Sequence, residues 1–231
     1  MSKINLSIIL PAYCEEENLR LLLPRIVSTM SNLAIGFEVI VVDTMEPLDN
    51  TRAVCQENGV KYLNRKNGNN YGDAIRTGIQ EACGEKIIFM DADGSHSPEF
   101  ILKLLESQDS YDVVIASRYI KGGYTENSKI LVLMSKILNI TYSIFLNIKC
   151  KDISNSFKLY DTSLIKSINL YCDNFDIVEE ILYKLSKHNK KLRIKEIPYT
   201  FKARIFGKTK RNLFLFIISY FVTMLKLRFG K

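Results

Sequence analysis

Short apolar runs alternate with longer amphipathic segments through the first half of the chain. Four runs have the length and composition of buried strands, namely Leu6–Leu10, Glu38–Val42, Lys86–Met90 and Asp112–Ala116. The segment Glu16–Met30 places apolar residues on one helical face: Leu19, Leu22, Leu23, Ile26, Val27 and Met30. This alternation predicts a doubly wound α/β fold, in which helices flank a mostly parallel sheet.

The length and composition suit one domain better than two. The chain has 231 residues, of which 47% are hydrophobic, so a sizeable core is available. We therefore expect one domain over residues 1–211. Residues 212–231 are expected to form an amphipathic helix, rich in basic and apolar residues, that belongs to this domain or contacts a membrane.

The cysteines and the N-terminus indicate a reducing compartment. The five cysteines are scattered and form no C-x-x-C pair, so neither a zinc site nor a disulfide framework is expected. The first residues run into a strand-like segment and carry no signal-peptide pattern. Both features predict a cytoplasmic location.

The positive charge is concentrated near the end of the chain. The formal net charge is +7. From Ile197 onward there are eight basic residues and no acidic one, whereas the remainder has 24 basic and 25 acidic residues. This asymmetry indicates an anionic partner, such as phosphate groups or a membrane surface, or else a solvated basic end. Nucleic acid is not an expected partner, because the tail lacks the pattern of a recognised binding module.

Polar and charged residues follow the predicted strands. They are Pro11–Glu15, Asp43, Asn64–Gly68 after a short strand at Lys61–Leu63, Asp91–Asp93, and Ser117–Tyr119. In doubly wound sheets, ligands bind beyond the carboxyl ends of the strands. We therefore expect the functional site at this edge of the sheet.

Asp91-Ala92-Asp93 is the strongest candidate for chemistry. Two carboxylates just past a buried strand are costly unless a cation neutralises them. Mg²⁺ or Mn²⁺ bridging to a diphosphate is a natural partner, because these ions take carboxylate and phosphate oxygens. The alternative is a helix start, since Ser97-Pro98-Glu99 follows, and both interpretations can hold together.

Six segments carry motifs in a fixed order. They are Leu10–Leu19 (LPAYCEEENL), Gly72–Gly78 (GDAIRTG), Met90–Pro98 (MDADGSHSP), Ser117–Gly123 (SRYIKGG), Asp152–Tyr160 (DISNSFKLY) and Ile197–Lys210 (IPYTFKARIFGKTK). Together they resemble glycosyltransferase family 2, and in particular its dolichyl-phosphate mannose synthase or polyprenyl-phosphate branch. The resemblance covers nearly the whole chain.

The resemblance implies a GT-A fold and an inverting, metal-dependent transfer from a GDP- or UDP-linked sugar to a polyprenyl phosphate. By this resemblance the nucleoside would be held by Pro11, Tyr13, Glu15 and Asp43. Asp91, Ala92 and Asp93 would contact the diphosphate, with the two carboxylates as Mg²⁺ or Mn²⁺ ligands. Phosphates of donor and acceptor would be bound by Arg118, Arg204 and Lys210.

The chain departs from the family pattern at several places. Thr44 follows Asp43 where a second acid is usual, and the turn after it is one residue longer, which bears on the choice of nucleotide. Cys14 stands where asparagine is usual, and Asn155 interrupts the S-G-F part of its motif. Between residues 128 and 136, where the branch has an arginine, only lysines are basic.

The acceptor decides whether a general base is needed. A lipid phosphate is already an anion, whereas a saccharide hydroxyl must lose its proton to a carboxylate. Asp152, Glu179 and Glu180 are the candidate bases, although the glutamates also fit the polar face of a helix. We group Asp152 and Glu180 with Asp91, Asp93 and Arg118 as candidate catalytic residues.

Other functions remain open. The chain could act on a saccharide hydroxyl in surface or capsular polysaccharide synthesis, or be an inactive relative that only binds a sugar nucleotide. A Rossmann dehydrogenase is excluded, because Pro11-Ala12-Tyr13 replaces the G-x-G-x-x-G turn after the first strand.

Two apolar segments favour a peripheral position at the cytoplasmic face of a membrane. Leu213–Leu225 has 13 residues between basic flanks, too few to span a bilayer but suited to its interface. Ile130–Ile148 is longer, contains polar residues and is expected to form an amphipathic helix beside the site. Either segment could instead pack on the sheet, on a membrane-protein partner or on a second copy of the chain.

Overall fold

The structure, a computed structural model, describes residues 3–206 and 213–229, with the backbone alone for residues 213–219. The first elements are β1 (Leu6–Pro11), α1 (Glu16–Ser31), β2 (Phe37–Asp43), α2 (Thr51–Glu57), β3 (Lys61–Asn64), α3 (Tyr71–Glu81), β4 (Lys86–Phe89), α4 (Phe100–Glu106) and β5 (Val113–Ser117). The remaining elements are β6 (Tyr124–Thr125), α5 (Lys129–Leu146), β7 (Lys158–Asp161), α6 (Thr162–Lys166), α7 (Ile177–His188), β8 (Ile194–Pro198), β9 (Thr200–Phe201) and α8 (Leu213–Phe229). The predicted strands and the first helix are confirmed, with small differences at their ends.

The main sheet has seven strands in the order β3-β2-β1-β4-β7-β5-β8. β1 pairs in parallel with β2 and with β4, and β2 pairs in parallel with β3. β7 is antiparallel to both of its neighbours, β4 and β5, while β5 and β8 are parallel. The sheet is therefore mostly parallel, as predicted, with one reversed strand near its middle.

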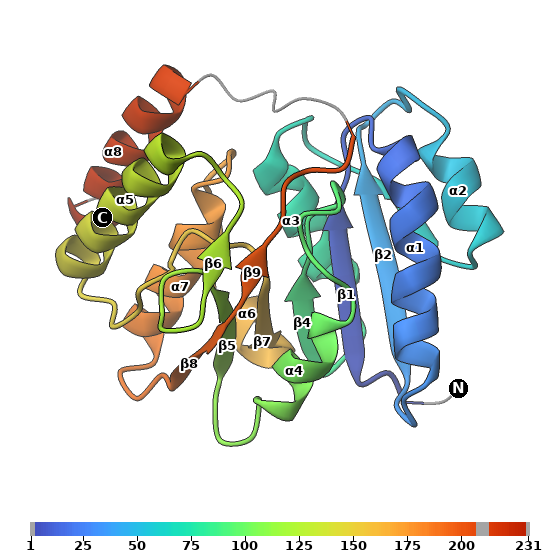
Figure 1. The fold of residues 1–231 in the computed structure, drawn as a ribbon, viewed down its shortest axis with the longest axis horizontal. Coiled ribbons are helices and arrows are strands. Elements are labelled where there is room, and N and C mark those ends of the chain that lie inside the picture. Colours follow the sequence, from blue (N-terminus) through green and yellow to red (C-terminus); the bar gives the residue numbers. More distant parts are fainter. Residues whose placement is uncertain (1–2, 207–212, 230–231) are drawn as a thin grey trace.

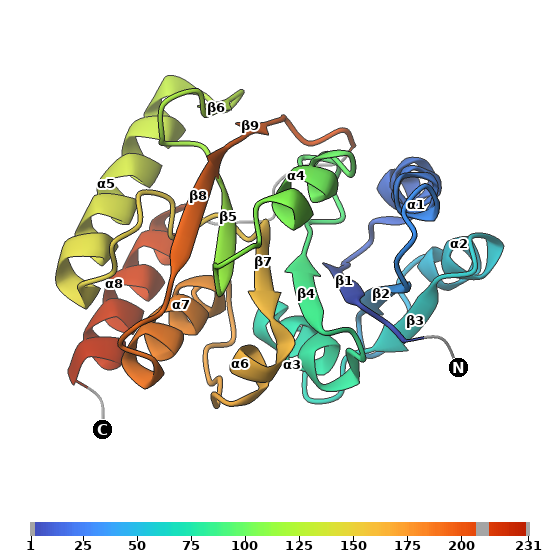
Figure 2. The same ribbon diagram turned by 90° about the horizontal axis from the view of Figure 1, so that it is seen from below.

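Helices cover both faces of this sheet (Figure 2). Neighbouring residues of β1 point to opposite faces: Ile8 packs with apolar residues of α1 and α4, whereas Ile9 packs with those of α3 and α7. Because side chains alternate along a strand, the apolar runs of the central strands supply both hydrophobic layers. This explains why those runs are continuous in the sequence.

α8 packs against α5 and α7 on one side of the molecule (Figure 1). The Tyr142 hydroxyl donates a 2.7 Å hydrogen bond to the Tyr220 carbonyl, and the Thr223 hydroxyl donates to the buried Asp176 carboxylate. Tyr220 and Met224 join the same hydrophobic cluster as α7. The predicted C-terminal helix is thus present and shares this core; the proposed boundary at residue 211 falls outside the described residues.

A short two-stranded ribbon brings residues 202–206 to the site. β6 and β9 pair in parallel, and the segment after β9 then runs across the end of the main sheet toward α1 (Figure 1). Along this path the Lys202 N–H donates to the Ser95 carbonyl at 3.2 Å, and the Ile205 N–H donates to the Asp93 carbonyl at 3.1 Å. Arg204 is thereby positioned over the end of β4.

Candidate active site at the end of β4

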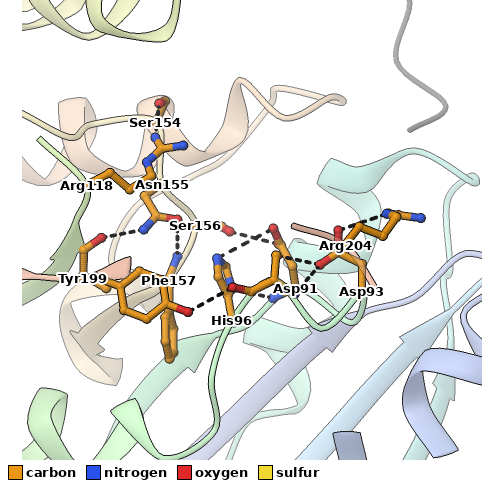
Figure 3. Close-up of polar contacts among 12 residues, drawn as sticks. Asp91, Asp93, His96, Arg118, Ser154, Asn155, Ser156, Phe157, Tyr199 and Arg204 are labelled. Atoms are coloured by element: carbon orange, nitrogen blue, oxygen red, sulfur yellow. Dashed lines mark hydrogen bonds and ion pairs between the residues drawn. The ribbon is translucent and has the colours of Figure 1, made fainter. Parts of the chain in front are cut away.

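Asp91 lies just past β4 and is held mainly by uncharged groups (Figure 3). The Ser156 hydroxyl donates to Asp91 Oδ1 at 2.9 Å, and the Tyr71 hydroxyl lies 3.5 Å from the same oxygen. The Asp91 N–H donates to His96 Nδ1 at 2.9 Å. The two hydroxyl groups orient the Asp91 carboxylate, and carboxylate oxygens are ligands that Mg²⁺ and Mn²⁺ accept.

His96 supports this turn from inside the protein. Its side chain is fully buried, and burial lowers its pKa, so the ring is neutral at physiological pH. Because Nδ1 accepts the Asp91 N–H, the ring proton is assigned to Nε2, which lies 3.9 Å from Asp91 Oδ2. The ring stacks on Phe157 at 4.6 Å between centroids. Sequence reasoning gave His96 no role, although its place in the Met90–Pro98 motif was a signal.

Asp93 is held by a cation as well as by hydroxyl and amide groups. Ser95 donates to Asp93 Oδ1 from its backbone N–H at 3.0 Å and from its hydroxyl at 2.6 Å. Arg204 Nε and Nη2 each lie 3.2 Å from Asp93 Oδ2. Burial alone would raise the pKa of Asp93, but the Ser95 hydrogen bonds and the nearby positive charge lower it.

Glu15 joins this group from the start of α1. Arg204 Nη1 lies 3.2 Å from Glu15 Oε1, and Asn18 Nδ2 donates to Glu15 Oε2 at 2.6 Å. Glu15 is buried, whereas Tyr13 is 40% exposed. The structure therefore brings together Glu15, Asp93 and Arg204, three residues predicted from separate motifs.

Asp43 is buried and does not face the solvent beside Glu15, Asp93 and Arg204. Its side chain is fully buried and accepts hydrogen bonds from the Thr44 N–H at 2.8 Å and the Tyr62 hydroxyl at 3.1 Å. Burial raises the pKa of Asp43. These contacts join the ends of β2 and β3. Pro11 ends β1 and Ala92 is buried between the two aspartates.

Arg118 forms a buried ion pair with Asp152. Arg118 Nε donates to Asp152 Oδ2 at 2.8 Å, and Nη2 donates to Oδ1 at 2.6 Å. The Arg118 N–H also donates to Oδ2, at 2.7 Å. Burial alone would lower the pKa of Arg118, but the Asp152 charge and hydrogen bonds raise it. The predicted phosphate ligand and the predicted base are thus paired with each other.

The other two candidate bases are also buried. Glu179 is 0% exposed and Glu180 is 1% exposed. The Glu180 carboxylate accepts the N–H groups of Tyr171 and Cys172 and lies 2.6 Å from Lys184 Nζ. Its contacts order the loop before α7. The remaining predicted residue, Lys210, lies outside the described part of the chain.

The arrangement at Asp91 and Asp93 fits a divalent ion that arrives with a diphosphate. Among residues 3–206 and 213–229, no group of three or more His, Cys, Asp or Glu side chains could hold a metal ion. Two carboxylates are the usual protein share for Mg²⁺, which completes its coordination with water and phosphate oxygens. The donor set thus matches the predicted Mg²⁺ or Mn²⁺.

Residues 7–168 match the family model described as glycosyl transferase family 2. The chain belongs to this family. The family membership, predicted from the six motifs, is thereby confirmed.

Curated relatives of this family 2 chain extend the comparison. It is 35% identical to a dolichol-phosphate mannosyltransferase of Pyrococcus furiosus, over 90% of this chain but only 59% of the relative's length. It is 31% identical to a polyprenol monophosphomannose synthase of Mycolicibacterium smegmatis, over 89% of this chain and 80% of that one. Both names fall in the polyprenyl-phosphate branch that the motifs resemble.

A solved structure confirms the predicted GT-A fold. Glucosyl-3-phosphoglycerate synthase of Mycobacterium tuberculosis, in complex with Mn²⁺, uridine diphosphate and phosphoglyceric acid, aligns with a TM-score of 0.72. The alignment covers 98% of this chain and 79% of the other, at 16% identity. The same enzyme has also been solved with Mg²⁺ and uridine diphosphate.

The buried ion pair predicts a structural role for Asp152. We expect Asp152→Ala to lower the free energy of unfolding by roughly 3–5 kcal/mol, because it leaves the Arg118 guanidinium buried without its partner. Urea denaturation followed by circular dichroism measures this loss. As a control, Arg25→Ala removes an exposed pair with Glu99 and should cost less than about 1 kcal/mol. Equal losses in the two variants would contradict the structural role.

Proposed function

We propose that this chain is an inverting glycosyltransferase that moves a sugar from a nucleotide-diphospho-sugar to a polyprenyl phosphate. One observation carries the choice of acceptor. The three carboxylates predicted as candidate bases, Asp152, Glu179 and Glu180, are all at most 1% exposed. A hydroxyl acceptor would need such a base at the reacting centre, whereas a phosphate acceptor brings its own anionic oxygen. The names of the curated relatives support the same acceptor.

In the proposed reaction, Tyr13 and Glu15 hold the nucleoside, and the buried Asp43 orders the ends of β2 and β3. Asp91 and Asp93 would hold Mg²⁺ or Mn²⁺, which would stabilise the negative charge of the departing nucleoside diphosphate. An acceptor phosphate oxygen forms a bond to the anomeric carbon from the face opposite the diphosphate. The bond to the diphosphate breaks with its electron pair, and the anomeric configuration inverts.

Positive groups near this centre suit two phosphate-bearing substrates. Arg204 lies beside Asp93, and we assign it, with Lys210, to phosphates of donor and acceptor. A guanidinium binds phosphate through two parallel hydrogen bonds, whereas an ammonium acts as a point charge. The Arg118 guanidinium is already bound by Asp152 and Ser154. We therefore propose that Arg118 orders the part of the site that receives the acceptor.

The membrane-facing side is proposed to be the exposed face of α5 and α8. Within the described ranges, α5 is the one helix long and apolar enough to cross a membrane, judged by length and composition alone. Its most exposed apolar residues are Ile130, Leu133, Ile137, Ile140 and Ile144, each at least 56% exposed. On α8, Phe221 and Phe229 are 58% and 71% exposed. We propose that this face lies in the bilayer interface at the cytoplasmic side, where a lipid phosphate is found.

A donor screen tests the proposed reaction. We expect the full chain to release nucleoside diphosphate from a GDP- or UDP-linked sugar when polyprenyl phosphate is added, in Mg²⁺ or Mn²⁺ only. Asp93→Ala should abolish release because the ion loses a ligand, whereas Asp109→Ala removes an exposed acid and should leave it intact. Full activity in a chelator, or in Asp93→Ala, would refute the metal-dependent reaction.

Liposome binding tests the proposed membrane face. We expect the chain to co-sediment with anionic liposomes, less so at high salt, because basic residues attract anionic lipid. Ile140→Glu should weaken binding by about 30-fold or more, since it removes an apolar contact with the membrane worth about 2 kcal/mol and adds negative charge. Gln56→Glu adds the same charge on α2, at the far end of the sheet, and serves as the control. Equal liposome binding of the two variants would exclude the α5 and α8 face as the membrane contact.

A further inference from the structure

Arg204 occupies the position between two acidic groups of the site. Its Nη1 lies 3.2 Å from Glu15 Oε1, and its Nη2 lies 3.2 Å from Asp93 Oδ2. The Arg204 side chain is 28% exposed, and those of Glu15 and Asp93 are 9% and 17% exposed. Partial burial weakens solvent screening, so each ion pair is stronger here than at an open surface.

The backbone around Arg204 is anchored on both sides. The Ile205 N–H donates to the Asp93 carbonyl at 3.1 Å, and the Phe206 N–H donates to Asn18 Oδ1 at 3.1 Å. The Ile205 side chain also packs on Gly94, where a Cβ atom would come within 2.4 Å of Ile205 Cδ1. Gly94 has a φ of +80°, so both the turn and this close approach favour glycine. Arg204 is therefore held against Asp93 by its own segment.

Both oxygens of the Asp93 carboxylate already have donors. Its Oδ1 accepts two hydrogen bonds from Ser95, and its Oδ2 faces two nitrogens of Arg204. A metal ion that binds Asp93 Oδ2 must therefore take this oxygen from the guanidinium. The metal ion and the guanidinium are both cations. If both contacted the same oxygen they would lie only a few ångströms apart and would repel each other.

We propose that Arg204 is the resident counter-ion of Glu15 and Asp93, and that only a metal ion bound to the donor diphosphate displaces it efficiently. A metal ion alone would leave the guanidinium without a partner. A metal–diphosphate offers it phosphate oxygens, to which a guanidinium binds in bidentate fashion. Metal and nucleotide should then bind cooperatively, each raising the affinity for the other by the same factor. This inference rests on the proposed metal-dependent use of a nucleotide donor.

Mn²⁺ binding to the full chain tests the counter-ion directly. Free Mn²⁺ is followed by electron paramagnetic resonance, without nucleotide and with saturating GDP or UDP. In the wild-type chain we expect nucleotide to tighten Mn²⁺ binding by about tenfold or more. In Arg204→Gln, Mn²⁺ should bind about tenfold more tightly without nucleotide, because the competing cation is gone, and the enhancement by nucleotide should shrink.

Two further variants separate the counter-ion from a general charge effect. Lys202→Gln removes the same charge from an exposed side chain two residues away and should behave as wild type. Arg204→Lys keeps the charge but loses the planar guanidinium that contacts two carboxylates at once. Its Mn²⁺ affinity without nucleotide should therefore lie between those of wild type and Arg204→Gln.

The outcomes distinguish this inference from the proposed function. If nucleotide supports Mn²⁺ binding but Arg204→Gln leaves the affinity without nucleotide unchanged, the counter-ion role is overturned and the metal site stands. A matching rise in Lys202→Gln would overturn it as well, because the effect would then be one of net charge. If the wild-type chain binds no Mn²⁺ with either nucleotide, the metal-dependent function fails together with this inference.

Discussion

The neutralisation of carboxylates at the end of the sheet is the constraint on which the site depends. Asp91 and Asp93 stand where a buried strand ends, and partly buried anions are costly without compensating charge or hydrogen bonds. Hydroxyl donors hold the Asp91 carboxylate, whereas Arg204 supplies positive charge to Asp93. The β6–β9 ribbon and the segment after it bring Arg204 to this point. The segment after β9 therefore adds its cation to a carboxylate cluster that comes from the first half of the chain.

Two of the carboxylates predicted as candidate bases have structural partners. Asp152 is paired with Arg118, and Glu180 is bound by Lys184 and by two backbone N–H groups. The Asp152 carboxylate joins segments 34 residues apart, and the Glu180 carboxylate ties the loop before α7 to that helix. A buried, paired carboxylate is a poor proton acceptor for a substrate hydroxyl. The proposed phosphate acceptor follows from this distribution of charge.

The sequence predicted those parts of the molecule that local patterns determine. The strands from β1 to β5 were readable, because buried parallel strands are continuous apolar runs. β7 was read only as part of a motif, since Lys158 breaks its apolar pattern. That lysine is fully buried, donates to the Ile153 carbonyl at 2.6 Å, and has its pKa lowered by burial to about 8. The two aspartates were found from the motif. The pairing of Arg204 with Asp93, 111 residues away, needed the tertiary structure.

The central claim is that the acceptor supplies its own nucleophilic anion. The most direct measurement compares sugar transfer to a polyprenyl phosphate with transfer to the polyprenol of the same chain length, using the full chain, a nucleotide sugar and Mn²⁺. Because a general base contributes at least about 100-fold, transfer to the alcohol should be slower by about that factor or undetectable. Comparable rates with the alcohol, or transfer only to a soluble saccharide, would contradict the account.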